Sequence, residues 1–417
     1  MTIHVIGAGL AGLAAAIRLT RAGHEVTVHE TAGHAGGRCR SFHDRTLDTV
    51  IDNGNHLVLS GNRSTLAYLN TIGAGDRLAG PQEAVFPFLD LGSGNRWQVR
   101  PNAGPVPWWV FDKARRVPGT SVGDYLSLAR LAVSSPRGTV AEVLERDNPL
   151  FARFWEPLVL AVLNAQPDRA AASLLRPVLL ETFARGGKAC RPLIARTSLG
   201  DTFIDPALSW LRHNGTAIGF GSRMTRLEFA GNEVSALNVS GNRIPVAADD
   251  RIVLAVPAPV AADLVPELTV PREHSPIVNL HFRLPSAPVT DWPAPFLGLI
   301  GGTAQWLFLR GDIASVTISA AEQIVDEPAD RIIALVWRDV ATALGMDAAA
   351  PPPARVVKEK RATFTQEPGQ LALRPGARTR FANLVLAGDW TDTGLPATIE
   401  GAIRSGFTAA DAAISRR

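Results

Sequence analysis

Glycines near the start of the chain have the spacing that binds a diphosphate. Gly7, Gly9 and Gly12 form a Gly-x-Gly-x-x-Gly motif. In such a motif the first glycine makes a tight turn, the second lets the backbone approach a pyrophosphate, and the third lets a helix pack on a strand. The N–H groups of Leu10 and Ala11, at the start of the following helical pattern, add unpaired donors and a positive dipole. We therefore expect a dinucleotide site here.

An acidic residue follows at the distance at which such motifs bind ribose. Glu30 lies about 20 residues after the glycines and directly after the β-branched run 25–29, where its carboxylate can accept hydrogen bonds from ribose hydroxyls. A carboxylate repels a 2′-phosphate, which argues against NADP at this site. The motif and the acid together leave NAD and FAD both open.

A second glycine-rich loop decides between these cofactors. In Gly33-His34-Ala35-Gly36-Gly37-Arg38, the backbone of Gly36 and Gly37 offers further donors, and Arg38 offers a fixed cation to an extended diphosphate. The strings GAGLAG and GHAGGR resemble those of the FAD superfamily that contains amine oxidases, phytoene desaturases and protoporphyrinogen oxidases. The resemblance implies FAD as the cofactor, with Arg38 holding its diphosphate.

The end of the chain carries the counterpart that this resemblance requires. Residues 383–387 are typical of a strand that runs into Gly388 and Asp389, and a helical pattern follows to the C-terminus. The resemblance implies that Gly388 and Asp389 bind the ribityl or phosphate region. It also implies that the helix start at Thr398 and Ile399 directs N–H groups at the pyrimidine edge, where reduced flavin is negative. No cysteine follows this segment, so we expect FAD to be bound non-covalently.

Two further motifs narrow the resemblance. Asp52-Asn53-Gly54-Asn55-His56, followed by aliphatic residues, and Gln305-Trp306-Leu307-Phe308 are similar to segments of hydroxysqualene dehydroxylases, flavoenzymes that complete squalene synthesis in bacterial hopanoid pathways. The superfamily commonly has a glycine at the position of Gly54 whose backbone lies along the flavin, so we place Gly54 and Asn55 at the cofactor. Asn55 replaces the usual Gln of these enzymes, and Leu309 a frequent acid.

This resemblance implies reductive removal of a hydroxyl from an isoprenoid allylic alcohol. The reaction needs a proton for the leaving oxygen and a hydride from reduced flavin for the allylic cation. His56 is the candidate proton donor, and a structural histidine bonded to backbone is the alternative. Asp52 could orient His56 or cap a turn. The chain has no second nucleotide motif, so NAD(P)H or another external reductant would bind transiently.

Two rival functions use the same fold. A carotenoid-type desaturase or an amine oxidase would work in the oxidising direction, but none of the four lysines matches the flavin-contacting lysine of amine oxidases. A non-catalytic isoprenoid carrier would share the fold without using a flavin. The intact diphosphate motifs argue against a carrier.

The motifs require an α/β fold that brings both ends of the chain to one cofactor. We expect a Rossmann-like FAD-binding domain of the glutathione-reductase and amine-oxidase type, with an interleaved α+β substrate domain. The resemblance places Met224 beside the adenine. Seven of the nine tryptophans fall in the expected substrate domain, which indicates a large apolar pocket. The expected FAD-binding domain comprises residues 1–60, 190–257 and 371–417, and the substrate domain comprises 61–189 and 258–370.

Composition excludes several other classes of protein. The 417 residues suffice for two or three domains. With 46% hydrophobic and 19% charged residues, the chain is too apolar for disorder, and a net charge of +3 gives no general nucleic-acid-binding field. Two cysteines exclude a disulfide framework and suit a reducing compartment. The uncharged run 292–309 contains two prolines and three glycines, which predicts two strands around a turn and not a membrane span. We expect a soluble, cytoplasmic protein.

One segment suggests contact with a membrane. Residues 107–118 place three aromatic side chains beside three cations, between two prolines. Tryptophan suits a membrane interface, and Lys and Arg attract anionic lipid. Either this segment docks on the inner membrane and admits the isoprenoid lipid, or Trp108 and Trp109 belong to the core and the cations are solvated.

Overall fold

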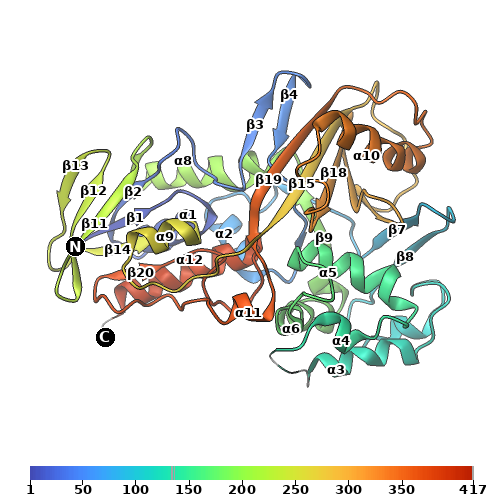
Figure 1. Ribbon diagram of the computed structural model, residues 1–417, viewed down its shortest axis with the longest axis horizontal. Helices are drawn as coiled ribbons and strands as arrows, with labels where there is room; N and C mark the ends of the chain where they lie inside the picture. Colours follow the sequence, from blue (N-terminus) through green and yellow to red (C-terminus); the bar gives the residue numbers. More distant parts are fainter. Residues whose placement is uncertain (133–134, 136, 416–417) are drawn as a thin grey trace.

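The computed structural model describes residues 1–132, 135 and 137–415. Its N-terminal β-branched runs form a parallel sheet in the order β10-β2-β1-β14-β20, to which all three expected FAD-binding segments contribute strands. The predicted α/β fold is confirmed (Figure 1). The strands of this sheet are β1 (Thr2–Ile6), β2 (Glu25–His29), β10 (Ala217–Gly219), β14 (Arg251–Leu254) and β20 (Leu384–Leu386).

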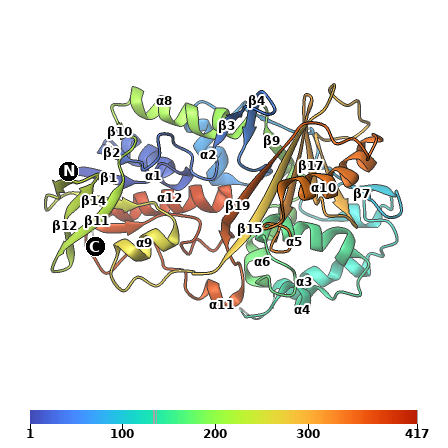
Figure 2. The ribbon, with the colours of Figure 1, turned by 45° about the horizontal axis from the view of Figure 1, so that its top comes forward.

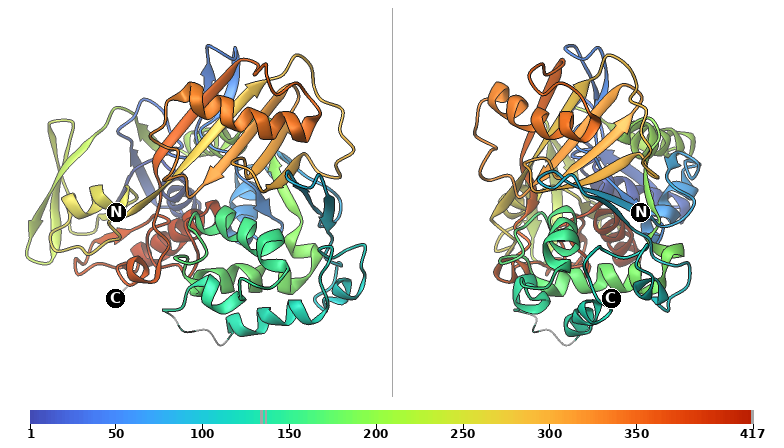
Figure 3. Two further views of the ribbon diagram at one scale, coloured as in Figure 1. Left: turned by 45° about the vertical axis from the view of Figure 1, so that its right-hand side comes forward. Right: turned by 90° about the vertical axis from the view of Figure 1, so that its right-hand side faces the viewer.

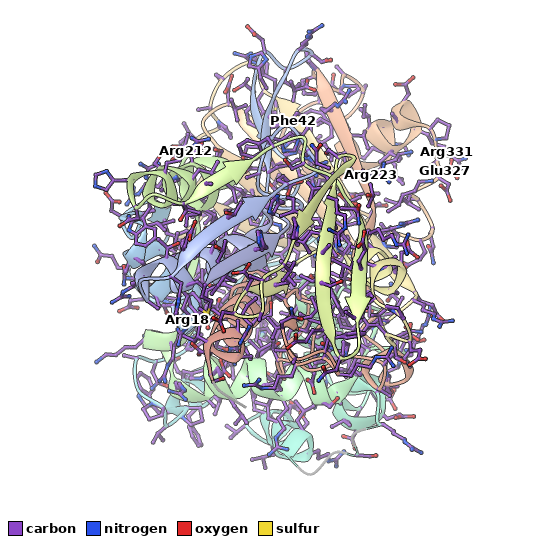
Figure 4. The ribbon with its side chains drawn as sticks, turned by 90° about the vertical axis from the view of Figure 1, so that its left-hand side faces the viewer. Arg18, Phe42, Arg212, Arg223, Glu327 and Arg331 are labelled. Atoms are coloured by element: carbon purple, nitrogen blue, oxygen red, sulfur yellow. The ribbon has the colours of Figure 1, made fainter. Side chains whose placement is uncertain are left out.

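Two helices from opposite ends of the chain pack against each other beside this sheet. They are α1 (Leu10–Arg21) and α12 (Ile399–Ile414). A Cβ on Gly406 would lie 2.2 Å from the carbonyl oxygen of Ala11, so only glycine permits this approach. Arg18 of α1, labelled in Figure 4, donates to both carboxylate oxygens of Asp411 at 2.6 and 2.8 Å.

Two helices that the expected boundaries assign elsewhere belong to this domain. Tyr68 and Leu69 of α2 (Arg63–Thr71) are fully buried in the same core as Ile3 of β1. Ala261 of α9 (Ala258–Leu264) packs with the β14 side of the sheet. The boundaries placed at residues 61 and 258 therefore need correction, because the sequence pattern shows a helix but not the core that it joins. The domain also contains α8 (Asp205–His213) and the antiparallel strands β11 (Met224–Ala230), β12 (Glu233–Val239) and β13 (Asn242–Pro245).

The second domain is built on a seven-stranded sheet in the order β19-β15-β18-β17-β16-β7-β8. Its pairs are antiparallel except for β16 with β7. The hairpin of β16 and β17 confirms the two strands predicted in residues 292–309. The long strands β15 and β19 lie side by side (Figure 2). The strands are β7 (Phe86–Asp90), β8 (Arg96–Val99), β15 (His274–Arg283), β16 (Phe296–Ile300), β17 (Trp306–Arg310), β18 (Ile313–Ser319) and β19 (Ala354–Phe364).

The two faces of the seven-stranded sheet have different neighbours. One face is covered by α10 (Ala329–Leu344), whose Trp337 ring lies 5.2 Å from that of Phe282 (Figure 3). The other face shares an aromatic core with a group of short helices. These are the 3₁₀ helices η1 (Trp108–Phe111) and η2 (Gly123–Ser127), and α3 (Leu128–Ala132), α4 (Val140–Leu144), α5 (Glu156–Leu163) and α6 (Ala172–Glu181).

Short strands join the two domains. The hairpin of β3 (Ser41–Asp44) and β4 (Thr49–Asp52) leads directly into the Asp-Asn-Gly-Asn-His motif. The strand β9 (Pro192–Ala195) pairs with both β5 (Val58–Leu59) and β6 (Leu78–Ala79). The motif therefore leaves a strand end at the junction of the domains.

Candidate active site

The first glycine loop leaves open space where a ligand would lie. No side chain caps the N-terminus of α1, whose N-cap residue is Gly9. A Cβ on Gly9 would meet no protein atom within 4 Å, and the φ angle of Gly9 is an ordinary −73°. The protein itself therefore does not require glycine here, whereas a diphosphate lying against the backbone would. Gly12 differs, because its Cβ would lie 1.9 Å from the Gly7 carbonyl oxygen, which confirms its predicted packing role.

The second glycine loop lies directly against the first. The N–H of Gly36 donates to the Ala8 carbonyl oxygen at 2.8 Å, and a Cβ on Gly37 would lie 3.6 Å from the Cα of Gly9. The Glu30 carboxylate accepts hydrogen bonds from the N–H groups of Ala8 at 2.7 Å and Ala32 at 2.8 Å. Strand β2 and both loops thus form one cradle, and its residues fit an FAD diphosphate and ribose.

Arg38 and Asp389 meet although they come from opposite ends of the chain. Nη2 of Arg38 donates to Oδ1 of Asp389 at 2.7 Å, and Nη1 donates to the carbonyl oxygen of Ala362 in β19. The Asp389 carboxylate raises the pKa of Arg38. The Arg38 side chain remains 44% exposed, so its cation faces open space as well as its partner. Asp389 follows Gly388, whose N–H donates to Oγ of Ser405 in α12.

The start of α12 is held by the residues around it. Oγ1 of Thr398 accepts the N–H of Gly401 at 3.1 Å, and Oε1 of Gln366 accepts the N–H of Ala397 at 2.7 Å. Ile399 is the first helical residue, so its N–H has no acceptor within the helix. This arrangement fits the predicted contact of Thr398 and Ile399 with a flavin edge. Met224 opens β11 with a buried side chain, and its contact with adenine stays a prediction.

The Asp-Asn-Gly-Asn-His motif is fixed to the seven-stranded sheet by a chain of hydrogen bonds. Nδ2 of Asn55 donates to Oγ1 of Thr317 at 3.2 Å, and that hydroxyl donates to Oδ1 of Asn279 at 2.8 Å. Nδ2 of Asn279 then donates to the carbonyl oxygen of Asn53 at 3.2 Å. A Cβ on Gly54 would meet Nδ2 of Asn279 at 3.4 Å, an ordinary contact distance. Gly54 thus differs from Gly9, because its Cβ would already contact protein atoms.

His56 presents an imidazole that none of the described residues engages in a hydrogen bond. Its ring is partly exposed, and its Nε2 lies 3.6 Å from where a Cβ on Gly54 would stand. The alternative of a structural histidine bonded to backbone is therefore not what the structure shows. Burial lowers the pKa of His56; the Asp52 carboxylate opposes this shift, and the Arg38 cation adds to it.

Asp52 does not orient His56, which corrects one of the two roles expected for it. Its carboxylate accepts from Oγ of Ser41 at 2.5 Å and the N–H of Leu199 at 2.9 Å, and pairs with Arg310 at 2.7 Å. In the described part of the chain no hydrogen bond joins it to His56. Asp52 ends β4 in a buried ion pair that connects two motifs, because Arg310 ends the strand that begins at Trp306.

His281 supports the same strand end, and sequence reasoning missed it. Its Nε2 donates to the Asp52 carbonyl oxygen at 3.0 Å, so its Nδ1 accepts from Oγ of Ser315 at 2.8 Å. His281 is fully buried, and burial together with the Arg310 cation lowers its pKa to about 4. The ring is therefore neutral at physiological pH. The available signal was the alternation of Asn279 and His281 with apolar residues along one strand.

Across one face of the seven-stranded sheet, the side chains change from polar on β15 and β18 to aromatic on the next strands. Residues directly opposite each other on paired strands share a face. Polar side chains on β15 and β18 hold the motif, and aromatic rings follow on the next strands. In order from β15 to β7, this face carries Asn279 and His281, Ser315 and Thr317, Trp306 and Phe308, Phe296 and Gly298, and Phe88. The motif that carries His56 is thus held, through Asn55, to the face whose outer strands carry aromatic rings.

The four lysines are exposed or bonded to partners outside the proposed site. Lys113 and Lys188 are exposed, Lys358 donates to the carbonyl oxygen of Glu327, and Lys360 pairs with Asp326.

Both cysteines are buried, and burial raises the pKa of the Cys190 thiol to about 12. Within the described ranges no His, Cys, Asp and Glu side chains cluster as metal ligands, and no helix has the length and apolarity to cross a bilayer.

Fold and site together define an FAD-dependent oxidoreductase, and comparison with known proteins agrees. Residues 10–414 match the family model described as flavin-containing amine oxidoreductase. The structure is similar to that of cyclohexylamine oxidase from Brevibacterium oxydans, with a TM-score of 0.70 and 16% identity over 99% of this chain and 98% of that one.

Two relatives resemble the chain along its whole length. The hydroxysqualene dehydroxylase of Rhodopseudomonas palustris is 47% identical over 98% of this chain and 97% of its own. That of Sinorhizobium fredii is 44% identical over 99% of this chain and 98% of its own. The chain belongs to the hydroxysqualene dehydroxylase family within the flavin-containing amine oxidoreductases.

Proposed function

We propose that the protein converts hydroxysqualene to squalene by reductive removal of the hydroxyl group. The observation that carries this proposal is the link between Asn55, which precedes His56, and Thr317, which lies opposite Trp306 on one face of the seven-stranded sheet. The names of its full-length relatives support the same reaction. Bound FAD, once reduced, supplies the hydride.

His56 is the group that delivers a proton to the leaving oxygen. The substrate loses its hydroxyl as water, and the carbon atom that held the oxygen gains hydrogen from the hydride. A lowered pKa makes protonated His56 a stronger acid but reduces its population at neutral pH. We therefore expect kcat/KM to rise as the pH falls from 7.5 toward 6, provided that the protein stays folded.

The aromatic wall protects the allylic cation that loss of water creates. Trp306 lies opposite Thr317, so its ring shares the face on which Asn55 is held. An aromatic ring attracts a cation through its quadrupole, and a dry apolar wall denies the cation a competing water. Nε1 of Trp306 is buried and has no hydrogen-bond partner among the described residues.

The Asn55, Thr317 and Asn279 chain positions the donor. It fixes the backbone on both sides of Gly54 without touching His56. Thr317→Val should therefore reduce turnover by misplacing His56 while leaving the flavin bound. Thr317→Ser keeps the hydroxyl and should restore turnover.

The external reductant is NAD(P)H or another reductant that binds transiently. Support comes from the single dinucleotide motif of the chain, which FAD occupies in this proposal. Anaerobic mixing of the FAD-loaded protein with NADH or NADPH, followed by flavin absorbance, identifies the donor by the rate of bleaching.

The deciding experiment incubates FAD-loaded protein with hydroxysqualene and reductant without oxygen, and measures squalene by gas chromatography. Wild-type protein should form squalene in proportion to the reductant consumed. His56→Gln should retain its flavin and lose about 10²–10⁴-fold in turnover. His213→Gln, an exposed histidine on α8, is the matched control. Absence of squalene although the flavin is reduced would refute the proposed reaction.

A further inference from the structure

Exposed apolar side chains gather on one short stretch of the second domain. Val106, Trp108, Phe111 and Leu126 are 71%, 52%, 70% and 70% exposed. Among the large hydrophobic residues that the structure describes as exposed, only Trp108 and Phe111 are aromatic. Single exposed apolar residues are ordinary, but a group that includes two aromatic rings indicates an interaction surface.

The neighbouring side chains anchor this group in the core. The Trp109 ring packs edge-on against Tyr125 at 5.2 Å, which joins η1 to η2. The N–H of Trp109 donates to Oδ1 of Asn102, and the Tyr125 hydroxyl accepts the N–H of Val117 at 3.0 Å. Trp109 is thus a core residue and Trp108 is not, so the two tryptophans expected to act alike have different roles. The exposed Trp108 and Phe111 rings are therefore carried by a helix, η1, whose Trp109 is packed in the core.

Positive charge surrounds these rings. Residues 100–130 contain five basic and two acidic side chains. Arg100 pairs with Glu83, Arg130 with Glu145 and Arg115 with Asp112, so Lys113 and Arg116 are the cations of this stretch that no ion pair among the described residues neutralises. The guanidinium carbon of Arg115 lies 5.0 Å from the centre of the Trp108 ring, and Lys113 is exposed. At a bilayer surface, the tryptophan ring can contact acyl chains while the neighbouring cation contacts anionic headgroups.

We propose that Val106, Trp108, Phe111 and Leu126, with Lys113 and Arg115, form a docking surface for a bilayer that contains anionic lipid. This proposal rests on the proposed function, because a long isoprenoid alcohol resides in lipid and the enzyme must reach it there. Trp109 and Trp306 belong to one hydrophobic core. Packed side chains therefore connect the base of the docking surface with the strand that carries Trp306.

Co-sedimentation of the FAD-loaded protein with vesicles tests the proposal without turnover. Wild-type protein should bind vesicles of phosphatidylcholine with phosphatidylglycerol more strongly than vesicles of phosphatidylcholine alone. The double variant Trp108→Ser with Phe111→Ser should lose about tenfold in binding to the anionic vesicles. Lys113→Glu should weaken binding to the anionic vesicles alone. Val50→Ser with Val289→Ser, which removes two exposed apolar side chains elsewhere, is the matched control and should bind like wild type.

Several outcomes would overturn the docking surface. One is equal vesicle binding by wild type and the Trp108 and Phe111 variant, with flavin absorbance unchanged in both. Another is sedimentation of wild type as a dimer and of that variant as a monomer, because the surface would then join two copies of the chain. Failure of the proposed reaction can be distinguished from failure of the docking surface. If vesicle binding depends on Trp108 but the protein forms no squalene, the docking proposal stands and the proposed reaction is refuted.

Turnover adds a second test when both proposals hold. The Trp108 and Phe111 variant should convert detergent-solubilised hydroxysqualene at the wild-type rate and slow only when the substrate is embedded in vesicles. Equal slowing in detergent and vesicles would place these residues in folding or substrate binding and would contradict docking.

Discussion

Replacing His281 by Gln should make the protein less sensitive to acid. His281 joins the Asp52 carbonyl oxygen to the Ser315 hydroxyl and is fully buried, so protonation would place an unpaired charge in the core. Glutamine carries an N–H donor and an oxygen acceptor but does not titrate in this range. The variant therefore keeps a means of bridging the two strands and loses the charge.

The size of the effect follows from the pKa shift. The pKa of His281 falls from its ordinary 6.5 to about 4 in the folded protein. Because the folded pKa is the lower one, the unfolded state binds the proton first, and stability present above pH 6.5 is lost as the pH falls toward 4. One pKa unit corresponds to about 1.4 kcal/mol, so wild type should lose about 2 kcal/mol at pH 5 through this residue.

The assay compares urea unfolding of FAD-saturated wild type and His281→Gln between pH 7.5 and 5. Other groups, including His29 with a pKa also lowered to about 4, contribute equally to both proteins and cancel in the difference. The variant should start less stable at pH 7.5 and approach wild type by about 2 kcal/mol at pH 5. Parallel pH profiles would show that His281 does not titrate as a buried neutral ring, and would refute the reasoning.

Three other substitutions test the site and its supports. Gly9→Val should fill the open side of the first loop and yield largely apo protein, measured by flavin absorbance after gel filtration; Gly376→Val, at an open glycine outside both loops, checks that bulk alone does not expel FAD. Arg310→Leu leaves Asp52 buried without its cation and should reduce the free energy of unfolding by about 3–5 kcal/mol. A change below 1 kcal/mol would contradict a buried ion pair at this position. Gly406→Val should separate α12 from α1 and lower both Tm and FAD occupancy, whereas unchanged values would mean that the helices do not approach as closely as the structure shows.

The cofactor motifs could be predicted because their chemistry lies in local spacing. Gly7 to Gly12, with Glu30, shows a strand, a tight turn and a helix within one short stretch of sequence. The hairpin of β16 and β17 was predictable for the same reason, since two apolar runs flank a Gly-Gly turn. In both cases neighbours in sequence are also neighbours in space.

The supports of the site depend on pairs that sequence spacing does not connect. Asp52 stands near His56 in sequence, yet its carboxylate bonds Arg310 from a strand of the other domain. Asn279 and His281 read as polar residues on an apolar strand, and only the strand register identifies what they hold. Likewise, the pattern of α2 shows an amphipathic helix but not which of two cores receives Tyr68.

The meeting of Arg38 with Asp389 has a consequence for the synthesis of the protein. The first two strands and both glycine loops leave the ribosome well before β20, Asp389 and α12, which follow the other described elements in the sequence. Until then the parallel sheet has a free edge at β14, and α1 lacks the helix against which it packs. The nascent chain therefore carries an incomplete cradle until that point, and tight capture of FAD follows the synthesis of α12. A premature stop codon anywhere before α12 should produce a colourless polypeptide, however complete its N-terminal nucleotide motif.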